Sequence, residues 1–313
     1  AAQMCIRDSF IPDYINLYSY KKNGGYQIAN KIKNGVISKK QVLDSLNESG
    51  LKGKGGAGFP TGKKWEIVSN YNGKKYVAVN GDEGEPGTFK DRSYLESDPH
   101  RFLEGALIAS YFINAHKVYI YMRDEYPAVI KILLDEINKM EDEEIIPKDF
   151  FIVRRGAGAY ICGEESAMIE SIEGKRGLPR HRPPYVAEIG LFGCPTLTNN
   201  LETLFWVRDI IEKGAKWFAE KGSNGNKGFH SFSVSGRVKN PGVKVAPAGI
   251  TIQQLIDKYC DGMADGHTFK GYLPGGASGG ILPATMNDIP LDYGSKELMD
   301  AGCFLGSAAV VVL

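Results

Sequence analysis

Three short apolar runs separated by amphipathic segments predict a parallel sheet. The runs cover Lys75–Val79, Lys117–Met122 and Asp149–Arg154. Between the first two, Asp98 followed by a proline has the form of a helix start, and Pro127–Lys139 repeats apolar residues at helical spacing. Strands that alternate with helices in this way pair in parallel through right-handed crossovers. Ligands of such sheets bind beyond the carboxyl ends of the strands.

Helices are also predicted before and after this α/β core in the sequence. Ser38 and Gln41 have the spacing of a capping box, and the helix they begin is expected to end near Gly50. Leu201–Lys213 is amphipathic. The acidic run Glu141–Glu144 is expected to be a solvated turn.

A second, smaller domain is predicted to begin near Phe229. Apolar residues alternate with serines from there, a turn follows at Asn240–Gly242, and Thr251 is placed to cap a helix. Strand, turn, strand and helix suggest a small ubiquitin-like β-grasp unit. The glycine-rich segment Gly271–Pro283 is either a ligand loop or an interdomain turn, and the first reading is preferred. These boundaries divide the chain into 1–50 (an N-terminal helical segment), 51–226 and 227–313.

Composition narrows the class of protein. The chain has 313 residues, enough for two domains or for one large domain with an appendage, and 42% of them are hydrophobic. The net charge of +1 gives no general attraction to nucleic acid or to a membrane surface. No stretch reaches the roughly 18 apolar residues of a membrane helix. The patternless start, residues 1–9, is expected to be a sequence-assembly remnant, and the strand-like Ala308–Leu313 suggests that the chain stops within a domain.

The five cysteines indicate reduced thiols. They are odd in number, scattered, and without a C-x-x-C pair, so a reducing, cytoplasmic setting is expected and no metal or cluster site within this chain. Cys162 is expected to be a packed side chain rather than a nucleophile, because no histidine lies near it in sequence.

The segment Gly53–Gly62, GKGGAGFPTG, is the strongest functional signal. Glycine lets the backbone approach a ligand closely, and a row of exposed N–H groups binds anions, phosphates above all. Phe59 offers a face for a planar ring, and Lys64 follows as a point charge. The alternative is a flexible linker, which Phe, Pro and Trp in and beside the segment disfavour.

A second loop, Val77–Thr88, leaves the first predicted strand and is acidic. Its carboxylates suit ribose hydroxyls, ring N–H groups or a metal, whereas its Asn-Gly-Asp and Glu-Pro-Gly sequences equally fit a solvated turn. A third loop, from Gly156, leaves the third strand at the same sheet edge without matching G-x-G-x-x-G. Its glutamates Glu164 and Glu165 fall at a predicted helix start, where the helix dipole alone would favour them.

A long basic and proline-rich excursion follows at Gly174–Asn200. A loop of this length inside a compact domain is usually functional. His181 is expected to be a contact or a surface residue, because no partner ligands surround it. Asn200 also suits the N-cap of the helix that begins at Leu201.

Four motifs in order resemble one family. GKGGAGFPTG, NGDEGEPG, GAYICGEE and PTLTNN are similar to the signatures of the 51 kDa-type NADH-binding flavoprotein subunit of respiratory complex I and related diaphorases. The likeness runs from about Gly24 to the last residue. Within the family, the segments Gly174–Gly193 and Gly275–Ala284 look most similar to the flavoprotein (beta) subunit of NAD-dependent formate dehydrogenase.

The resemblance implies an oxidoreductase subunit that binds FMN and NAD(H), with hydride exchange between the two and no catalytic side chain of its own. It implies that FMN is surrounded by Lys64, Asn80, Asp82, Glu83, Tyr160, Gly163, Glu164, Asn199 and Asn200. It implies that the dinucleotide is held by Gly53, Gly55, Gly56, Ala57, Gly58, Phe59, Thr61, Gly62, Glu85, Glu165, Arg182 and Tyr185.

Departures from the family pattern limit this carry-over. Arg182 and Tyr185 stand where relatives often have Lys and Phe, and Ile67 replaces a second stacking aromatic. The C-x-x-C-x-x-C motif of a 4Fe–4S cluster is missing, and the resemblance places it just beyond residue 313. A 4Fe–4S cluster and the C-terminal helical domain that holds it are therefore expected only in a full-length protein. The lack of a basic cluster in the loop from Asn80 to Glu85 favours NAD over NADP.

Two further functions stay open at this point. The same module serves complex I or an NAD-reducing hydrogenase, where iron–sulfur partner subunits take the electrons. A nucleotide-binding module without redox function is the alternative of another class, and the acidic loop counts against it because a phosphate sensor has no evident use for those carboxylates.

Overall fold

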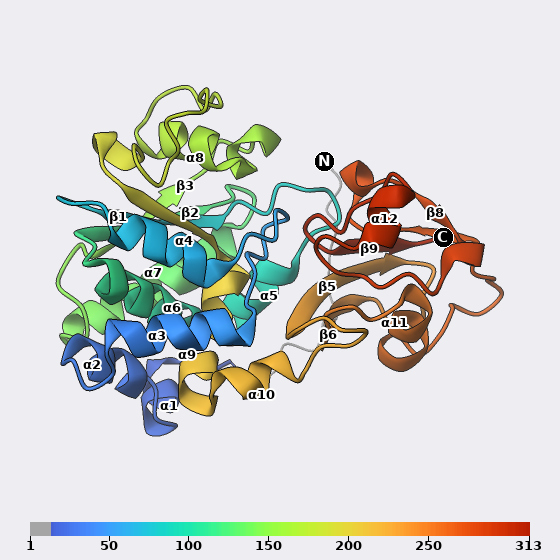
Figure 1. Ribbon diagram of the computed structural model, residues 1–313, viewed down its shortest axis with the longest axis horizontal. Helices are drawn as coiled ribbons and strands as arrows, with labels where there is room; N and C mark the ends of the chain where they lie inside the picture. The colour runs from blue at the N-terminus through green and yellow to red at the C-terminus, as the bar shows by residue number, and fades with distance from the viewer. Residues whose placement is uncertain (1–13) are drawn as a thin grey trace.

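Two packed units make up the part of the chain that the structure, a computed structural model, describes, residues 14–313 (Figure 1). The expectation for residues 1–9 lies outside the described residues. Within the described range, no helix combines the length and apolar character needed to cross a bilayer.

The first unit is built on a four-stranded parallel sheet of order β3-β2-β1-β4. Its strands are β1 (Tyr76–Gly81), β2 (Lys117–Met122), β3 (Phe151–Arg155) and β4 (Thr196–Asn200). Parallel pairing is therefore confirmed, and both loops expected at the carboxyl edge leave β1 and β3 there. β4 was not predicted.

Helices cover both faces of this sheet. They are α1 (Leu17–Lys22), α2 (Gln27–Lys33), α3 (Lys39–Ser49), α4 (Thr61–Ser69), α5 (Lys90–Ser97), α6 (Pro99–Ile113), α7 (Pro127–Asp142), α8 (Glu165–Ile172), α9 (Leu201–Lys213) and α10 (Ala215–Ala219). One face and the helices α3, α4, α6, α7 and α9 share a large apolar core, whereas α8 packs on the opposite face (Figure 1).

Capping side chains set several helix ends as predicted. Ser38 and Gln41 form the capping box of α3, which ends at Gly50 in the left-handed conformation. Asp98 caps α6, and Asn200 caps α9. The acidic run beginning at Glu141 differs from the prediction: α7 continues to Asp142, so only its last residues lie in the turn.

The second unit is a five-stranded mixed sheet of order β6-β5-β9-β7-β8. Its elements are β5 (Phe229–Gly236), β6 (Gly242–Pro247), α11 (Ile252–Tyr259), β7 (Gly271–Leu273), β8 (Leu282–Pro283), α12 (Lys296–Asp300) and β9 (Ala309–Val312). Short 3₁₀ turns complete the chain at η1 (Tyr160–Gly163), η2 (Leu191–Gly193), η3 (Ala277–Gly279) and η4 (Ala284–Met286). The predicted capping box of α11 at Thr251 is present.

The serine face of β5 is buried against the first unit rather than solvated. Ser231 Oγ lies 2.5 Å from Tyr94 Oη on α5 and 2.7 Å from a Glu202 carboxylate oxygen on α9. Ser233 Oγ accepts a hydrogen bond from the N–H of Phe89. This contact places the second unit beside the carboxyl edge of the parallel sheet, where ligands of such sheets bind.

Candidate functional site

A pocket of about 330 Å³ lies at the carboxyl edge of the parallel sheet. The acidic loop after β1, the glycine-rich loop before α4 and the turn before α8 form three of its walls. The segment 304–307 and Ser278 of the second unit contribute to the fourth. Three loops that are distant in sequence therefore meet where the strand order predicted a ligand.

The acidic loop turns sharply at Glu83, which is buried at a positive φ of 47°. Its carboxylate accepts hydrogen bonds from the N–H groups of Asp91 (2.7 Å) and Arg92 (3.2 Å) at the start of α5. Burial and the neighbouring Asp91 carboxylate raise the pKa of Glu83 above its usual value. Burial likewise raises the pKa of Asp82 to about 6. The loop therefore presents carboxyl groups that hold protons more readily than exposed ones.

Glu85 links the acidic loop to both other sides of the pocket. Its carboxylate accepts hydrogen bonds from Tyr160 Oη (2.7 Å) and from the N–H and Oγ of Ser278 (3.1 and 2.9 Å). Tyr160 lines the pocket and is 59% exposed, so part of its side chain is accessible at the pocket rim. The glycine-rich segment around Ser278 thus joins the two units and lines the pocket at once.

The start of α8 carries the two predicted glutamates. Glu164 caps the helix by accepting from the N–H groups of Ser166 and Ala167, both at 2.9 Å, and pairs with Arg182. Lys64 Nζ donates to Glu165 (3.1 Å) and to Thr198 Oγ1 (2.7 Å). Although burial favours the neutral acid, Lys64 and Thr198 hold the pKa of Glu165 below its usual value. These charges form a balanced group next to the pocket.

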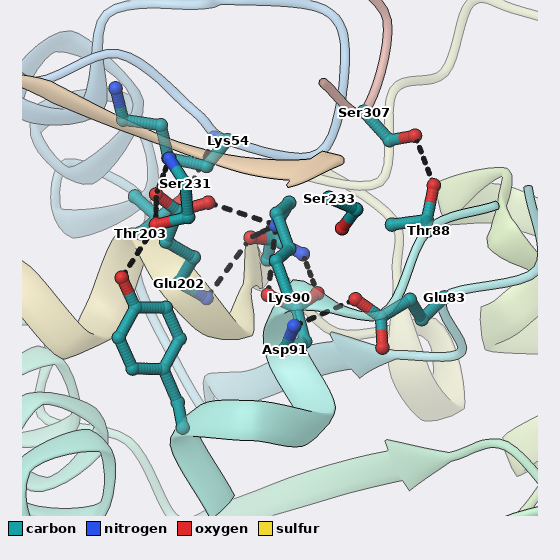
Figure 2. A network of polar contacts seen from close by, with 12 residues as sticks. Lys54, Glu83, Thr88, Lys90, Asp91, Glu202, Thr203, Ser231, Ser233 and Ser307 are labelled. Carbon is teal, nitrogen blue, oxygen red and sulfur yellow. Dashed lines mark hydrogen bonds and ion pairs between the residues drawn. The ribbon is translucent and has the colours of Figure 1, made fainter. Parts of the chain in front are cut away.

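Lys90 is a buried cation in the pocket wall, 1% exposed. Its Nζ lies 2.8 Å from Asp91 and 2.9 Å from Glu202, the arrangement drawn in Figure 2. Although burial disfavours the ammonium, these carboxylates hold the pKa of Lys90 well above its usual value. Asn200 joins the same network by donating to Asp91 at 2.7 Å.

Glycines of the glycine-rich loop serve two different purposes. A Cβ on Gly55 would lie 3.3 Å from Asn200 Cβ at the pocket, whereas one on Gly58 would lie 2.6 Å from Tyr293 Cβ in the second unit. A Cβ on Gly62 would lie 2.2 Å from Asn47 Oδ1. Within the described residues, no protein acceptor takes the N–H of Gly55 or Gly56. The ligand-facing part of the loop is therefore its first half.

The structure brings part of the predicted set together. The predicted residues that line the pocket are Gly55, Gly56, Asn80, Glu83, Glu85, Tyr160, Gly163, Glu164 and Asn200. Outside its lining lie Gly53, Ala57, Gly58, Phe59, Thr61, Gly62, Lys64, Asp82, Glu165, Arg182, Asn199 and Tyr185. Of these, Phe59 and Tyr185 are exposed, Thr61 and Gly62 are buried in the first turn of α4, and Asn199 accepts from Trp65 Nε1. His181 is exposed and Cys162 is buried.

Sequence reasoning missed several pocket residues. They are Lys54, Gly84, Thr88, Lys90, Asp91, Ile161, Ser278, Phe304, Gly306 and Ser307. Lys54 and Gly84 lie inside segments that were already singled out, so the signal was present. Residues 304–307 precede β9 and carry no motif, and only the packing of the two units brings them to the pocket.

Comparison with known proteins shows the family of the chain. Residues 46–209 match the protein family described as the Nuo51 FMN-binding domain. The chain is 41% identical over 317 residues to an F-type subunit of NADH-quinone oxidoreductase of Rhizobium meliloti (strain 1021), covering 98% of this chain and 75% of that protein. It is also 41% identical to the F-type subunit of NADH-quinone oxidoreductase of Aquifex aeolicus (strain VF5), covering 99% of this chain and 72% of that protein.

A solved structure shares the fold. The crystal structure of an NAD+-reducing [NiFe]-hydrogenase in the air-oxidized state superposes with a TM-score of 0.78 at 35% identity and covers 88% of this chain. The chain spans about half, 47%, of that hydrogenase chain. The match over residues 46–209 and the identity to two NADH-quinone oxidoreductase proteins lead to one conclusion: the chain belongs to the 51 kDa-type NADH-binding flavoprotein family of complex I.

Proposed function

We propose that this chain binds FMN and NAD(H) in the pocket at the carboxyl edge of its parallel sheet, as a diaphorase-type subunit of an NADH:acceptor oxidoreductase. The observation that carries the proposal is the meeting of three loops there, one of them rich in glycine and one acidic. The volume of about 330 Å³ falls in the usual range of small-molecule sites.

The residues present fit a flavin and a dinucleotide. The N–H groups of Gly55 and Gly56, which no protein acceptor within residues 14–313 takes, suit phosphate or ring oxygens. The cradle at Gly55 would be narrowed by a Cβ 3.3 Å from Asn200. The exposed aromatic side chain of Tyr160 suits a planar ring, and the Glu83 and Glu85 carboxyl groups suit ring N–H or ribose hydroxyl donors.

The chain's own residues position the ligands and exclude water. FMN bound in this pocket would supply the hydride chemistry with the nicotinamide, since that chemistry belongs to the cofactor. The acidic loop and the start of α8 orient the ring system, and Lys64 with Glu165 lies beside them at the α4 side. Phe304 and Ser307 close the site from the second unit. No side chain needs to transfer a proton to the nicotinamide carbon.

The domain assignment forms part of this proposal. The unit 51–226 holds the ligands, the helices α1, α2 and α3 of the segment 1–50 pack against it, and 227–313 is a β-grasp domain. In its support, the β5–β6 hairpin is followed by α11, and the last strand β9 pairs in parallel with β5 at the centre of the sheet.

The parent complex is proposed from the relatives. The NADH-quinone oxidoreductase proteins and the NAD+-reducing hydrogenase favour a complex I-type or hydrogenase-type assembly. Iron–sulfur partner subunits, a 4Fe–4S cluster in the full-length protein and a cytoplasmic location belong to the proposal on the family resemblance of the four sequence motifs alone. Formate dehydrogenase is a second candidate on the segments Gly174–Gly193 and Gly275–Ala284 alone. Co-purification of quinone-linked, hydrogenase or molybdopterin subunits distinguishes the three.

The test of ligand binding is a visible absorption spectrum after FMN addition and desalting, followed by anaerobic NADH. Retained flavin bands that bleach with NADH are expected. A protein with a native circular dichroism spectrum that retains no flavin would contradict the proposal.

A matched pair of tyrosine variants locates the site. Tyr160→Ala removes the ring at the pocket rim, and Tyr18→Ala removes one that is 74% exposed on α1. Removing an aromatic stacking interaction together with its buried area weakens binding about tenfold, so the flavin dissociation constant of Tyr160→Ala should rise by about that factor. Tyr18→Ala should bind as the unchanged chain does. Equal binding by both variants would place the flavin elsewhere.

A further inference from the structure

The glycine-rich loop is tied to the second unit by two lysines that flank Gly53. Lys54 Nζ donates to the carbonyl oxygen of Phe229 at 2.5 Å and lies 3.0 Å from His230 Nδ1. Lys52 Nζ donates to Asp292 Oδ2 at 3.0 Å and to the Tyr293 carbonyl oxygen at 3.2 Å. Both cations of the loop therefore point away from its glycines and into the second unit.

His230 and Asp292 are themselves hydrogen bonded. His230 Nε2 lies 2.6 Å from Asp292 Oδ1, and both side chains are buried, 1% and 5% exposed. A carboxylate can only accept, so Nε2 carries the proton and Nδ1 keeps a lone pair for the Lys54 ammonium. The neutral imidazole with its proton on Nε2 can donate to Asp292 and accept from Lys54. The other neutral tautomer and the imidazolium cannot make both hydrogen bonds.

The rest of the loop also rests on the second unit. Gly58 packs against Tyr293, where a Cβ would lie 2.6 Å from Tyr293 Cβ, and a Cβ on Gly56 would lie 3.5 Å from the backbone of Gly306. A smaller cavity, about 90 Å³, is lined by this side of the loop and by residues 292–306. The loop is therefore held between the ligand pocket on one side and the second unit on the other.

We propose that His230 is a positioning residue for the nucleotide site: with Asp292 it forms a clamp on Lys52 and Lys54 that holds the glycine-rich loop in its ligand-binding conformation. The identity of the ligands rests on the proposed function. His230 does not line the pocket itself, and it reaches the pocket only through its contact with Lys54, which does line it. The clamp therefore acts on binding and leaves the hydride step itself unchanged.

The loop conformation is tested without any ligand. Three amides report it: Gly53 N–H bonds to the Phe59 carbonyl, Lys54 N–H to Thr203 Oγ1, and Thr61 N–H to the Leu51 carbonyl. His230→Phe keeps the ring and removes both nitrogens. Of the two hydrogen bonds lost, the one with Lys54 reaches the loop directly. Loss of one buried charge-assisted hydrogen bond corresponds to about tenfold, so hydrogen exchange of these amides should become at least about tenfold faster. Exchange in α7 should not change.

Matched variants separate the clamp from general damage. His230→Gln retains one hydrogen-bonding group and should restore part of the protection. His267→Gln changes an exposed histidine of the same unit and should exchange as the unchanged chain does. If His230→Phe does not fold, the test uses Lys52→Met instead, which changes the half-exposed end of the clamp. The same increase in the exchange rate of the three amides is expected. Unchanged exchange of the three amides in a folded variant overturns the clamp.

The second readout is kinetic and uses the FMN-loaded chain with ferricyanide as electron acceptor. His230→Phe should raise KM for NADH about tenfold, by the same hydrogen-bond argument, with kcat unchanged. A fall in kcat at constant KM would contradict a positioning role. If the unchanged chain binds neither FMN nor NADH while His230→Phe still loosens the loop, the proposed function fails and the clamp stands.

Discussion

Buried ionisable side chains gather along the seam between the two units. Lys54, Lys90, Glu202 and His230 are each at most 2% exposed. Each bonds to a partner on the other side of the seam or to a pair that reaches it, and Figure 2 shows Lys54, Lys90 and Glu202. Removing one partner of a buried ion pair is strongly destabilising, because it leaves the other charge buried and uncompensated. The seam is therefore the part of the molecule most sensitive to single substitutions.

Lys90→Met should destabilise the protein strongly. It leaves the buried carboxylates of Asp91 and Glu202 without their cation, and loss of one partner of a buried pair costs about 3–5 kcal/mol. The control Lys40→Met breaks the exposed pair with Asp44 and should leave the free energy of unfolding nearly unchanged, because solvent screens such a pair. Urea unfolding measures the free energy of unfolding of both variants. Equal changes in the two would show that Lys90 does not compensate buried carboxylates.

Acid stability should depend on His230. Burial and the Lys54 ammonium lower its pKa to about 4, so between pH 6.5 and 4 the unfolded chain binds more protons than the folded one. The contribution of His230 to the free energy of unfolding is therefore fully present above pH 6.5. About 3 kcal/mol of it is lost as the pH falls from 6.5 to 4. Unfolding free energies at pH 7, 6 and 5 should fall less steeply in His230→Gln. His267→Gln should keep the original slope, and an unchanged slope in His230→Gln would refute the assignment.

At the scale of elements, patterns with a local cause were predicted well. The capping residues Ser38, Asp98 and Thr251 begin the helices expected of them, because a cap is a contact between near neighbours. β4 was missed because its apolar content is a single leucine, Leu197. Its threonines are buried and make hydrogen bonds that the sequence does not show, such as the one that Thr198 Oγ1 accepts from Lys64 Nζ.

The glycine-rich loop shows the same limit within the candidate site. Its glycine content predicted a ligand loop, yet the reason for each glycine depends on a distant neighbour. Gly58 faces Tyr293 and Gly62 faces Asn47, so neither position is explained by a ligand. Only packing identifies Gly55 and Gly56 as the pocket-facing pair.

Two alanine substitutions in this loop should differ sharply. Gly58 has a φ of 62°, and its Cβ would lie 2.6 Å from Tyr293 Cβ, so Gly58→Ala should cost about 2–3 kcal/mol through backbone strain and overpacking. Gly53 lies outside the left-handed region, and the nearest atom to its Cβ is 3.6 Å away, so Gly53→Ala should cost about 0.5 kcal/mol or less. Thermal unfolding compares them. A tolerated Gly58→Ala would mean that Tyr293 does not pack on the loop as described.

At the scale of the whole molecule, the ligand pocket belongs to neither unit alone. Phe304 and Ser307 reach it from the second unit, and Thr88 Oγ1 lies 2.6 Å from Ser307 Oγ across the seam. The sequence predicted each unit from its own periodicity, but nothing in either pattern predicts how the two face each other. That is why Lys90 and Ser307 were missed while the acidic loop was found.

The two units should therefore unfold together. Separation would expose Ser231, Ser233 and His230, which are buried at 1% or less, and would break the contact of Ser231 with Glu202. Unpaired buried polar groups cost about 1–3 kcal/mol each, so an intermediate with one unit folded is disfavoured by several of them at once. The three tryptophans, Trp65, Trp206 and Trp217, all lie in the first unit, so their fluorescence reports its unfolding. Hydrogen exchange of β5 and α11 reports the second, and both should give the same urea midpoint. If the α11 amides exchange at clearly lower urea than the midpoint of the fluorescence change, the second unit unfolds separately from the first. The seam would then be an ordinary domain contact rather than part of the core of the fold.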